Sequence, residues 1–298
     1  FAPAKIWIPC KVKIEAARPG FFTRLSNGER AWTLARWAVR LMEGCLQSLR
    51  GRTPRFWRIS PPVIAKQSIY DRSNRRVFSL YTRDAIDLNL MGLIFDRNEY
   101  GFERLARHNE LKALYENILA RNLAPLIIDC GAHGGFATKF FSETYPRARI
   151  VALEPDPENF ELAKRNTAQD RTSLLCAAIG NADGLGTLNR GHNSLAHRID
   201  GDPNGQTRII SINSILDDER RLGASPFIVK IVIEGFEDDL FERSTDWIDA
   251  FPVLIIELHD WMLPGSANSR NFLREMARRN RDFIHFGKNI FSVSNTIG

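Results

Sequence analysis

The chain has 298 residues, of which 44% are hydrophobic and 26% are charged, a balance typical of globular proteins in water. No apolar run approaches the roughly 18 residues that a membrane-spanning helix needs. The net charge of +6 is unevenly distributed, because residues 1–60 carry twelve Lys or Arg and only three acids. The four cysteines form no CxxC pair and offer no metal-ligand spacing, so we expect reduced thiols in a cytoplasmic protein.

Residues 1–65 form a basic N-terminal segment that ends in a linker. Within it, residues 30–50 place apolar side chains at helical intervals with arginines between them, which predicts an amphipathic helix. Two interpretations stay open for residues 1–60: a peripheral membrane or acidic-partner contact, or a solvated basic helix packed by its apolar face. The Pro- and Arg-rich stretch at 52–63 predicts the linker.

Residues 66–124 predict a strand-plus-helix lead-in to a larger domain. Residues 76–88 alternate as a strand does, and residues 100–122 have the periodicity of an amphipathic helix.

From residue 125 to the end, short apolar runs alternate with helical segments. The predicted strands are 125–130, 148–155, 172–180, 226–234 and 251–259, and the predicted helices are 135–145, 157–167, 236–248 and 269–280. This alternation favours an α/β fold with a mostly parallel sheet covered by helices on both faces. The closing runs, 281–287 and 289–295, predict an antiparallel edge hairpin.

The first of these strands runs into a glycine loop, "DCGAHGGF", which begins at Asp129. A dinucleotide site needs glycine where this loop has His133, since a side chain there obstructs the pyrophosphate. An NAD-dependent oxidoreductase is therefore disfavoured. The loop does match the looser D-x-G-x-x-x-G pattern of adenosylmethionine-dependent methyltransferases, through Asp129, Gly131 and Gly135, with Gly134 beside it. We expect Phe136, which follows, to belong to the same cofactor site.

The next strand ends in Glu154, whose carboxylate can accept hydrogen bonds from both hydroxyls of a ribose. Pro155 follows and is a candidate cofactor contact, and Asp156 and Phe160 are candidates to frame the adenosine. Asp156 has a second interpretation as the N-cap of the next helix. Ala178 and its neighbours are predicted to lay an apolar surface against the adenine.

His133 also has two interpretations. Its side chain either contacts the cofactor or the substrate, or it occupies a loop position where unusual backbone angles are tolerated.

Five segments together resemble the FkbM family of adenosylmethionine-dependent methyltransferases: "IIDCGAHGGF", "ARIVALEPDPENFELAKRNT", "CAAIGNADG", "PFIVKIVIEGFEDDLF" and "VLIIELHDWMLPGSANSRNFL". The resemblance covers roughly residues 100–295. It implies a class I methyltransferase (Rossmann-like) fold with a seven-stranded sheet, S-adenosyl-L-methionine as cofactor, and methyl transfer to a hydroxyl oxygen of a sugar, glycan or secondary metabolite.

The chain departs from the family at Val232, where K-I-D-[IV]-E-G typically supplies an aspartate. In the strand predicted over 226–234, Lys230, Val232 and Glu234 share one face, so a carboxylate is missing from that face. Either Glu234 takes over the role of the missing aspartate, or methyl transfer is weak or lost and the chain is a cofactor-binding protein of the same fold. A third interpretation is that Val232 simply packs in a buried strand.

Transfer to a hydroxyl needs a base near the acceptor. The candidate catalytic residues are His259 as base, Glu257 to orient it, Glu234, and Lys230, which would neutralise Glu234 or bind an acidic group of the acceptor. We expect no required metal and no nucleic-acid partner. The polar loop at 191–206 is a candidate acceptor loop or a plain surface connection.

Overall fold

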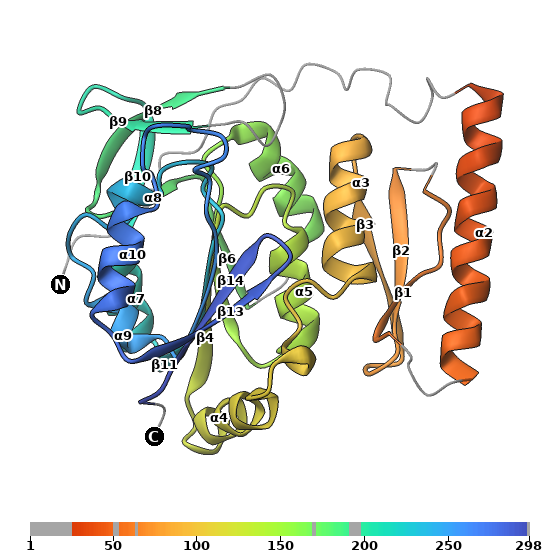
Figure 1. The fold of residues 1–298 in the computed structure, drawn as a ribbon, viewed down its shortest axis with the longest axis horizontal. Helices are drawn as coiled ribbons and strands as arrows, with labels where there is room; N and C mark the ends of the chain where they lie inside the picture. The colour runs from red at the N-terminus through yellow and green to blue at the C-terminus, as the bar shows by residue number, and fades with distance from the viewer. Residues whose placement is uncertain (1–25, 50–53, 63–64, 169–170, 191–197, 297–298) are drawn as a thin grey trace.

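The computed structural model describes residues 26–49, 54–62, 65–168, 171–190 and 198–296. Its centre is a seven-stranded sheet in the order β13-β14-β12-β11-β4-β5-β6 (Figure 1). The strands are β4 (Ala124–Cys130), β5 (Arg149–Leu153), β6 (Thr172–Leu175), β11 (Ala224–Ile231), β12 (Val253–Glu257), β13 (Arg281–Phe286) and β14 (Asn289–Ser294). Neighbouring strands among β12, β11, β4, β5 and β6 pair in parallel, and β14 pairs with both β12 and β13 in the antiparallel direction. The predicted mostly parallel sheet with an antiparallel edge hairpin is confirmed.

Helices cover both faces of this sheet. α4 (His108–Ala120), α5 (Phe136–Thr144) and α6 (Pro157–Asn166) lie on one face, and α7 (Ile212–Arg221), α8 (Glu237–Leu240), α9 (Trp247–Ala250) and α10 (Arg270–Ala277) lie on the other (Figure 1). Successive strand residues alternate between the two cores, as Ile127 and Ile128 do. Each strand is therefore apolar on both faces, which explains the continuous apolar runs in the sequence.

A separate three-stranded antiparallel sheet contains β1 (Phe56–Arg58), β2 (Lys66–Asp71) and β3 (Arg76–Tyr81). The prediction of a plain linker at 52–63 is therefore wrong, because β1 lies inside it. Phe56 and Phe78 pack edge-on, and Phe56 also contacts Phe140 of α5 at a centroid distance of 5.5 Å. Aromatic packing thus joins the small sheet to the domain.

The lead-in is more broken than its periodicity predicts. The strand predicted over 76–88 ends at Tyr81, and Asp84 then caps α3 (Ala85–Met91), which continues into the π-helical turn η1 (Gly92–Asp96). The helix predicted over 100–122 is divided into the 3-10 turn η2 (Phe102–Arg104) and α4.

Two further predicted elements are split. Residues 172–180 form not one strand but β6 and β7 (Ala178–Gly180), and β7 belongs to a third sheet, β7-β10-β8-β9, with β8 (Gly184–Asn189), β9 (Arg198–Gly201) and β10 (Thr207–Ser211). The amide of Ala177 donates to the carbonyl of Leu175, which turns the chain between the sheets. The helix predicted over 236–248 is α8 and α9, interrupted near Ser244, whose φ of 55° is left-handed.

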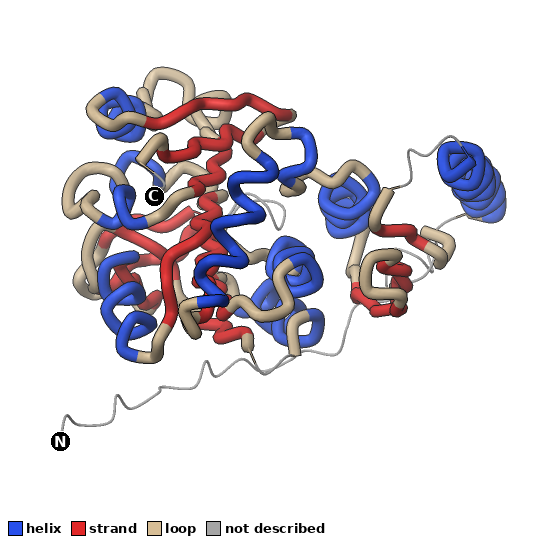
Figure 2. The backbone as a smooth tube through the Cα atoms, turned by 90° about the horizontal axis from the view of Figure 1, so that it is seen from below, coloured by secondary structure: helices blue, strands red, loops and turns tan. Residues whose placement is uncertain are grey.

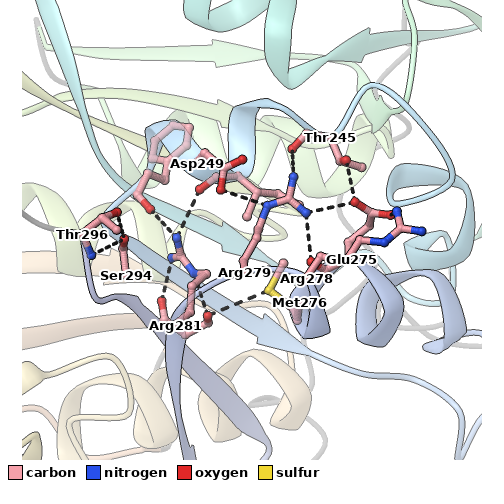
Figure 3. Close-up of polar contacts among 12 residues, drawn as sticks. Thr245, Asp249, Glu275, Met276, Arg278, Arg279, Arg281, Ser294 and Thr296 are labelled. Atoms are coloured by element: carbon pink, nitrogen blue, oxygen red, sulfur yellow. Dashed lines mark hydrogen bonds and ion pairs between the residues drawn. The ribbon is translucent and has the colours of Figure 1, made fainter.

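The hairpin at the sheet edge is fastened by a buried arginine. Arg281, the first residue of β13, donates to the carbonyl oxygens of Ile248, Phe251 and Pro252 and to the hydroxyl of Ser292 (Figure 3). Burial lowers the pKa of Arg281 to about 10. The guanidinium therefore supplies buried hydrogen-bond donors to carbonyl groups in and just after α9.

The predicted N-terminal amphipathic helix is α2 (Asn27–Leu49), which lies beside the small sheet at the edge of the molecule (Figures 1 and 2). Ser26 and Glu29 form a reciprocal capping box at its start. Residues 1–25 of the basic segment, and residues 191–197 of the loop predicted at 191–206, lie outside the described residues. Among the helices that the structure describes, none combines the length and hydrophobicity needed to cross a bilayer.

Candidate functional site

A cavity opens at the carboxyl ends of β4, β5 and β11, where ligands of parallel sheets bind. It is lined by eight of the predicted site residues: Gly131, His133, Phe136, Glu154, Pro155, Ala178, Lys230 and Glu234. Six others do not line it: Asp129, Gly134, Gly135, Asp156, Glu257 and His259. More than half of the predicted site residues thus line one cavity, and the structure shows that the other six are not part of its wall.

Glu154 presents a buried carboxylate to this cavity, with a side chain that is only 5% exposed. Its Oε2 accepts a hydrogen bond of 2.7 Å from the amide of His133, and its Oε1 accepts one of 3.0 Å from the amide of Asp156. Burial raises the pKa of Glu154 even though both amides oppose the shift. Oε1 also accepts a longer hydrogen bond of 3.4 Å from Asn159 Nδ2, whereas Oε2 keeps a further lone pair. The group can therefore accept a hydrogen bond from a ribose hydroxyl, and its contact with both hydroxyls stays a prediction.

Apolar side chains form another part of the cavity wall. Ala177, Ala178 and Ile179 line the cavity as the chain passes into β7, and Phe236 and Ile199 line it as well. A carboxylate facing small apolar side chains fits a nucleoside, whose sugar carries hydroxyls and whose base presents a flat apolar surface.

Gly131 brings the loops after β4 and β11 together. Its φ is +79°, and a Cβ at this position would lie 1.9 Å from the carbonyl oxygen of Val232. Only glycine permits this approach.

The other loop glycines serve helix packing. Gly135 has a φ of +78°, and a Cβ there would meet the Cα of Ala163 in α6 at 3.0 Å. A Cβ at Gly134 would meet Leu162 at 2.7 Å. The structure therefore places both glycines against α6 and outside the cavity lining, in contrast to the predicted cofactor contacts.

Asp129 and Lys230 form an ion pair behind the loop. Lys230 Nζ lies 2.9 Å from Asp129 Oδ1 and donates to the carbonyl of Gly131 at 2.7 Å, while Thr138 Oγ1 donates to Asp129 Oδ2 at 2.6 Å. The predicted pairing of Lys230 with Glu234 is therefore wrong: the lysine compensates Asp129 and holds the loop. Both groups are buried, so each requires the other.

His133 occupies a left-handed loop position, as one of its two interpretations held, and its contact with the cofactor or the substrate stays a prediction. Its φ of +49° is left-handed, and its ring lines the cavity. Its Nε2 lies 2.8 Å from Asp87 Oδ1, and Arg83 pairs with the same carboxylate. Burial of Asp87 opposes ionisation, but the hydrogen bonds from His133 and Arg83 outweigh it and hold the pKa of Asp87 well below its usual range. No sequence pattern pointed to Asp87, which lies 46 residues before His133.

Asp156 is the N-cap of α6. Its Oδ1 accepts hydrogen bonds from the amides of Glu158 and Asn159, and its Oδ2 pairs with Arg190 at 2.8 Å. With these partners and no place in the cavity wall, the capping interpretation is correct and the adenosine contact is not supported.

Beyond β11 the strand alternation stops, because the strand ends at Ile231 and Glu234 has a φ of +53°. Glu234 still reaches the cavity, and its side chain is 20% exposed. His259 lies behind it, 1% exposed, with Nε2 3.5 Å from Glu234 Oε2 and 3.8 Å from Glu257 Oε1. The residue that holds His259 by a hydrogen bond is Glu237, whose Oε1 lies 2.5 Å from Nδ1.

These contacts set two unusual acid–base groups side by side. Burial, reinforced by the neighbouring carboxylates of Glu257 and Glu237, raises the pKa of Glu234 to about 7, although His259 opposes the shift. Burial alone would lower the pKa of His259, but the hydrogen bond to Glu237 and the three nearby carboxylates raise it. A carboxyl group that titrates near neutral pH at a cavity wall, as Glu234 does, is typical of acid–base sites.

Glu237 is the functional candidate that the sequence analysis missed. It is fully buried, and Asn268 donates to its second oxygen. Its signal in the sequence was an acid at the start of the segment "EDDLF", which has the ordinary explanation of a favourable charge at a helix N-terminus. No group of three or more His, Cys, Asp or Glu within the described ranges is arranged to hold a metal ion.

Two curated relatives match short parts of the chain. A malonyl-(acyl-carrier protein) O-methyltransferase of Priestia megaterium is 33% identical over 72 residues, which are 24% of this chain and 26% of the relative. A protein of the same description from Anoxybacillus flavithermus is 29% identical over 100 residues, which are 33% of this chain and 38% of the relative. The matches therefore span well under half of either relative.

Solved structures with a similar outline include an O-methyltransferase from Bacillus cereus in complex with SAH. It shows 13% identity and a TM-score of 0.36, over 68% of this chain and 100% of that one. The O-methyltransferase TomG from Streptomyces achromogenes, in complex with SAM, shows 16% identity and a TM-score of 0.38, over 70% and 89%. We draw no conclusion from TM-scores this low.

The methyltransferase FkbM domain model matches residues 129–284, just over half of the chain. The match runs from the acid of the glycine loop to the edge hairpin and includes the whole cavity wall on β4, β5 and β11. Adenosylmethionine, predicted from the loop and Glu154, is the cofactor of this family, and the predicted resemblance is confirmed. The chain belongs to the FkbM methyltransferase domain family.

Proposed function

We propose that the chain is an adenosylmethionine-dependent O-methyltransferase that acts on a hydroxyl of a sugar, glycan or secondary metabolite, with Glu234 as general base. The observation that carries the proposal is the carboxylate of Glu234, which lines the cofactor cavity and has a pKa of about 7. A base with a pKa near the working pH is the most effective at taking a proton from a neutral acceptor. The names of the two curated relatives are consistent with oxygen as the acceptor atom.

The cofactor fits the residues that are present. Glu154 would hold the ribose hydroxyls, the wall at Ala177–Ile179 would face the adenine, and the loop at Gly131 would approach the methionine part. Bound adenosylmethionine supplies an electrophilic methyl group on a sulfonium. The remaining task of the protein is to orient the acceptor in line with that methyl group and to remove its proton.

Glu234 would accept the proton of the acceptor hydroxyl, so that its oxygen can take the methyl group that the bound cofactor would supply. His259, fixed at Nδ1 by Glu237, holds its Nε2 toward Glu234 and stabilises the carboxylate before the transfer. His259 is buried behind Glu234, so it is a positioning residue here and not the base that the sequence analysis favoured.

A cofactor-binding protein with weak transfer is the second candidate, and Val232 favours it. Val232 lines the cavity at the position where the family typically has an aspartate. Introducing Val232→Asp and measuring methyl transfer tests this candidate directly. A large gain from a low starting rate supports it, whereas a high starting rate with no gain excludes it.

The experiment for cofactor binding is calorimetric titration of the whole chain with adenosylmethionine and, separately, with NAD. Replacing Glu154→Gln removes the charged acceptor and should weaken adenosylmethionine binding by about 10- to 100-fold. The matched control is Glu158→Gln, a solvent-exposed glutamate near the same loop. Tight NAD binding, or equal affinity of the two variants, contradicts the assignment of the cavity.

The experiment for the reaction is transfer of labelled methyl groups to a panel of hydroxylated glycans, lipids and small metabolites, with malonyl-(acyl-carrier protein) included. We expect transfer to at least one hydroxyl acceptor, and a loss of about 100-fold or more in Glu234→Gln. Transfer only to a carboxylate, unaffected by Glu234→Gln, would contradict the hydroxyl proposal, because an ionised acceptor needs no base.

A further inference from the structure

Helix α2 leaves its apolar face exposed. Leu34 is 38% exposed, Val39 is 48% exposed and Met42 is 60% exposed. The small residues of the same stripe are exposed as well: Ala31, Ala35 and Ala38. The spacing of the stripe is that of one helix face, so these side chains form a continuous apolar surface about three turns long.

The side of α2 that is partly covered is a different one. Arg30, Thr33 and Trp37, which follow one another at helical spacing, are half-buried. The helix lies beside the small β1–β3 sheet at the periphery of the molecule in both views (Figures 1 and 2). One side of the helix is therefore partly covered, while the apolar stripe is exposed, where an isolated monomer gains nothing from it.

The charge around α2 identifies the occupant. The sequence on either side of the helix is basic and contains one acid, Glu15, against Lys5, Lys11, Lys13, Arg18, Arg24, Arg50 and Arg52. Arg55 and Arg58 add little to this positive charge, because each forms an ion pair, with Asp71 and Asp96 respectively. An apolar helix stripe with basic flanks matches a bilayer surface, which offers acyl chains beneath anionic headgroups.

A second copy of the chain is a poorer occupant. Pairing two α2 helices along the stripe would bring their basic flanks together, and like charges oppose that association. We propose that α2 is an interfacial helix that docks this protein on membranes containing anionic lipid, with its apolar stripe in the interface. This proposal does not depend on the reaction or on its acceptor.

The test is co-sedimentation of the full chain with lipid vesicles. One set contains phosphatidylcholine alone, and the other contains about one third phosphatidylserine. We expect binding to the anionic vesicles in about 0.1 M salt, and a loss on the order of tenfold in about 0.5 M salt, because surface electrostatics are screened. Equal binding to both vesicle types, or no binding to either, would overturn the proposal.

The variant L34E/M42E places two negative charges in the stripe and should lose anionic-vesicle binding by at least about tenfold. Its control is L185E/L222E, which makes the same kind of change at two exposed leucines outside α2. Both variants should keep the melting temperature of the parent chain. The proposal is overturned if L34E/M42E still binds as the parent does. It is also overturned if sedimentation velocity shows a parent dimer that only this variant dissociates, which would make the stripe an interface between copies.

Discussion

Replacing Glu234→Gln should make the protein more stable and much less active. The carboxyl of Glu234 has a pKa of about 7 in the folded protein, against an ordinary value of 4.5, because burial disfavours its charge. A difference of this size corresponds to about 3 kcal/mol of folding free energy, at 1.36 kcal/mol for each pKa unit. Since the side chain is only 20% exposed, solvent screening reduces this figure modestly.

The sign of the effect follows from proton binding. Between pH 4.5 and pH 7 the folded state holds the proton of Glu234 more tightly than the unfolded state, so the stability of the parent chain falls as the pH rises. Above pH 7 the full cost of the buried charge is present. Glutamine carries no charge and avoids that cost. It also removes an attraction to His259, so we expect a net gain of about 1 to 3 kcal/mol at pH 8 and little difference near pH 4.

Two assays check this prediction. Urea unfolding of the parent and of Glu234→Gln across this pH range measures the stability difference. Initial rates of methyl transfer over the same range should rise to a plateau above about pH 7 in the parent and be lower by about 100-fold or more in the variant. Glu158→Gln, an exposed carboxylate, is the control for both. The reasoning fails if Glu234→Gln is destabilised at pH 8, or if it keeps a rate within a few fold of the parent.

Three further predictions follow from the site. Glu237→Gln should lower the pKa of His259, which NMR titration of the ring would report, and should reduce kcat while leaving cofactor affinity unchanged; an unaltered pKa would exclude the positioning role of Glu237. Lys230→Met leaves its buried carboxylate partner unpaired and should cost about 3 to 5 kcal/mol in urea unfolding at pH 7, so a neutral result would contradict the buried ion pair. Gly131→Ala forces a Cβ against the carbonyl oxygen of Val232 in a left-handed backbone, and should lower the melting temperature and weaken adenosylmethionine binding; unchanged values of both would disprove the close approach.

Local patterns in the sequence were enough for the central sheet and for part of the site. Apolar runs read as buried strands because both faces of the sheet are covered, and Glu154 was found because the acid that ends a strand can be located from the strand itself. Predictions from the same patterns were wrong where a turn lies inside an apolar or helical stretch, as at Ser244. Periodicity over a short window does not register a single left-handed residue.

The partners within the site were decided by tertiary structure alone. Lys230 lies close to Glu234 in the sequence and far from Asp129. It nevertheless pairs with Asp129, because β11 and β4 are neighbours in the sheet. Asp87 reaches His133 across the fold, from α3 in the lead-in segment 66–124, where the sequence predicted a strand. A sequence specifies which groups carry charge and which segments become strands. It does not specify which charges meet, because that depends on the order of the strands and on which side chains burial leaves within a few ångströms of one another.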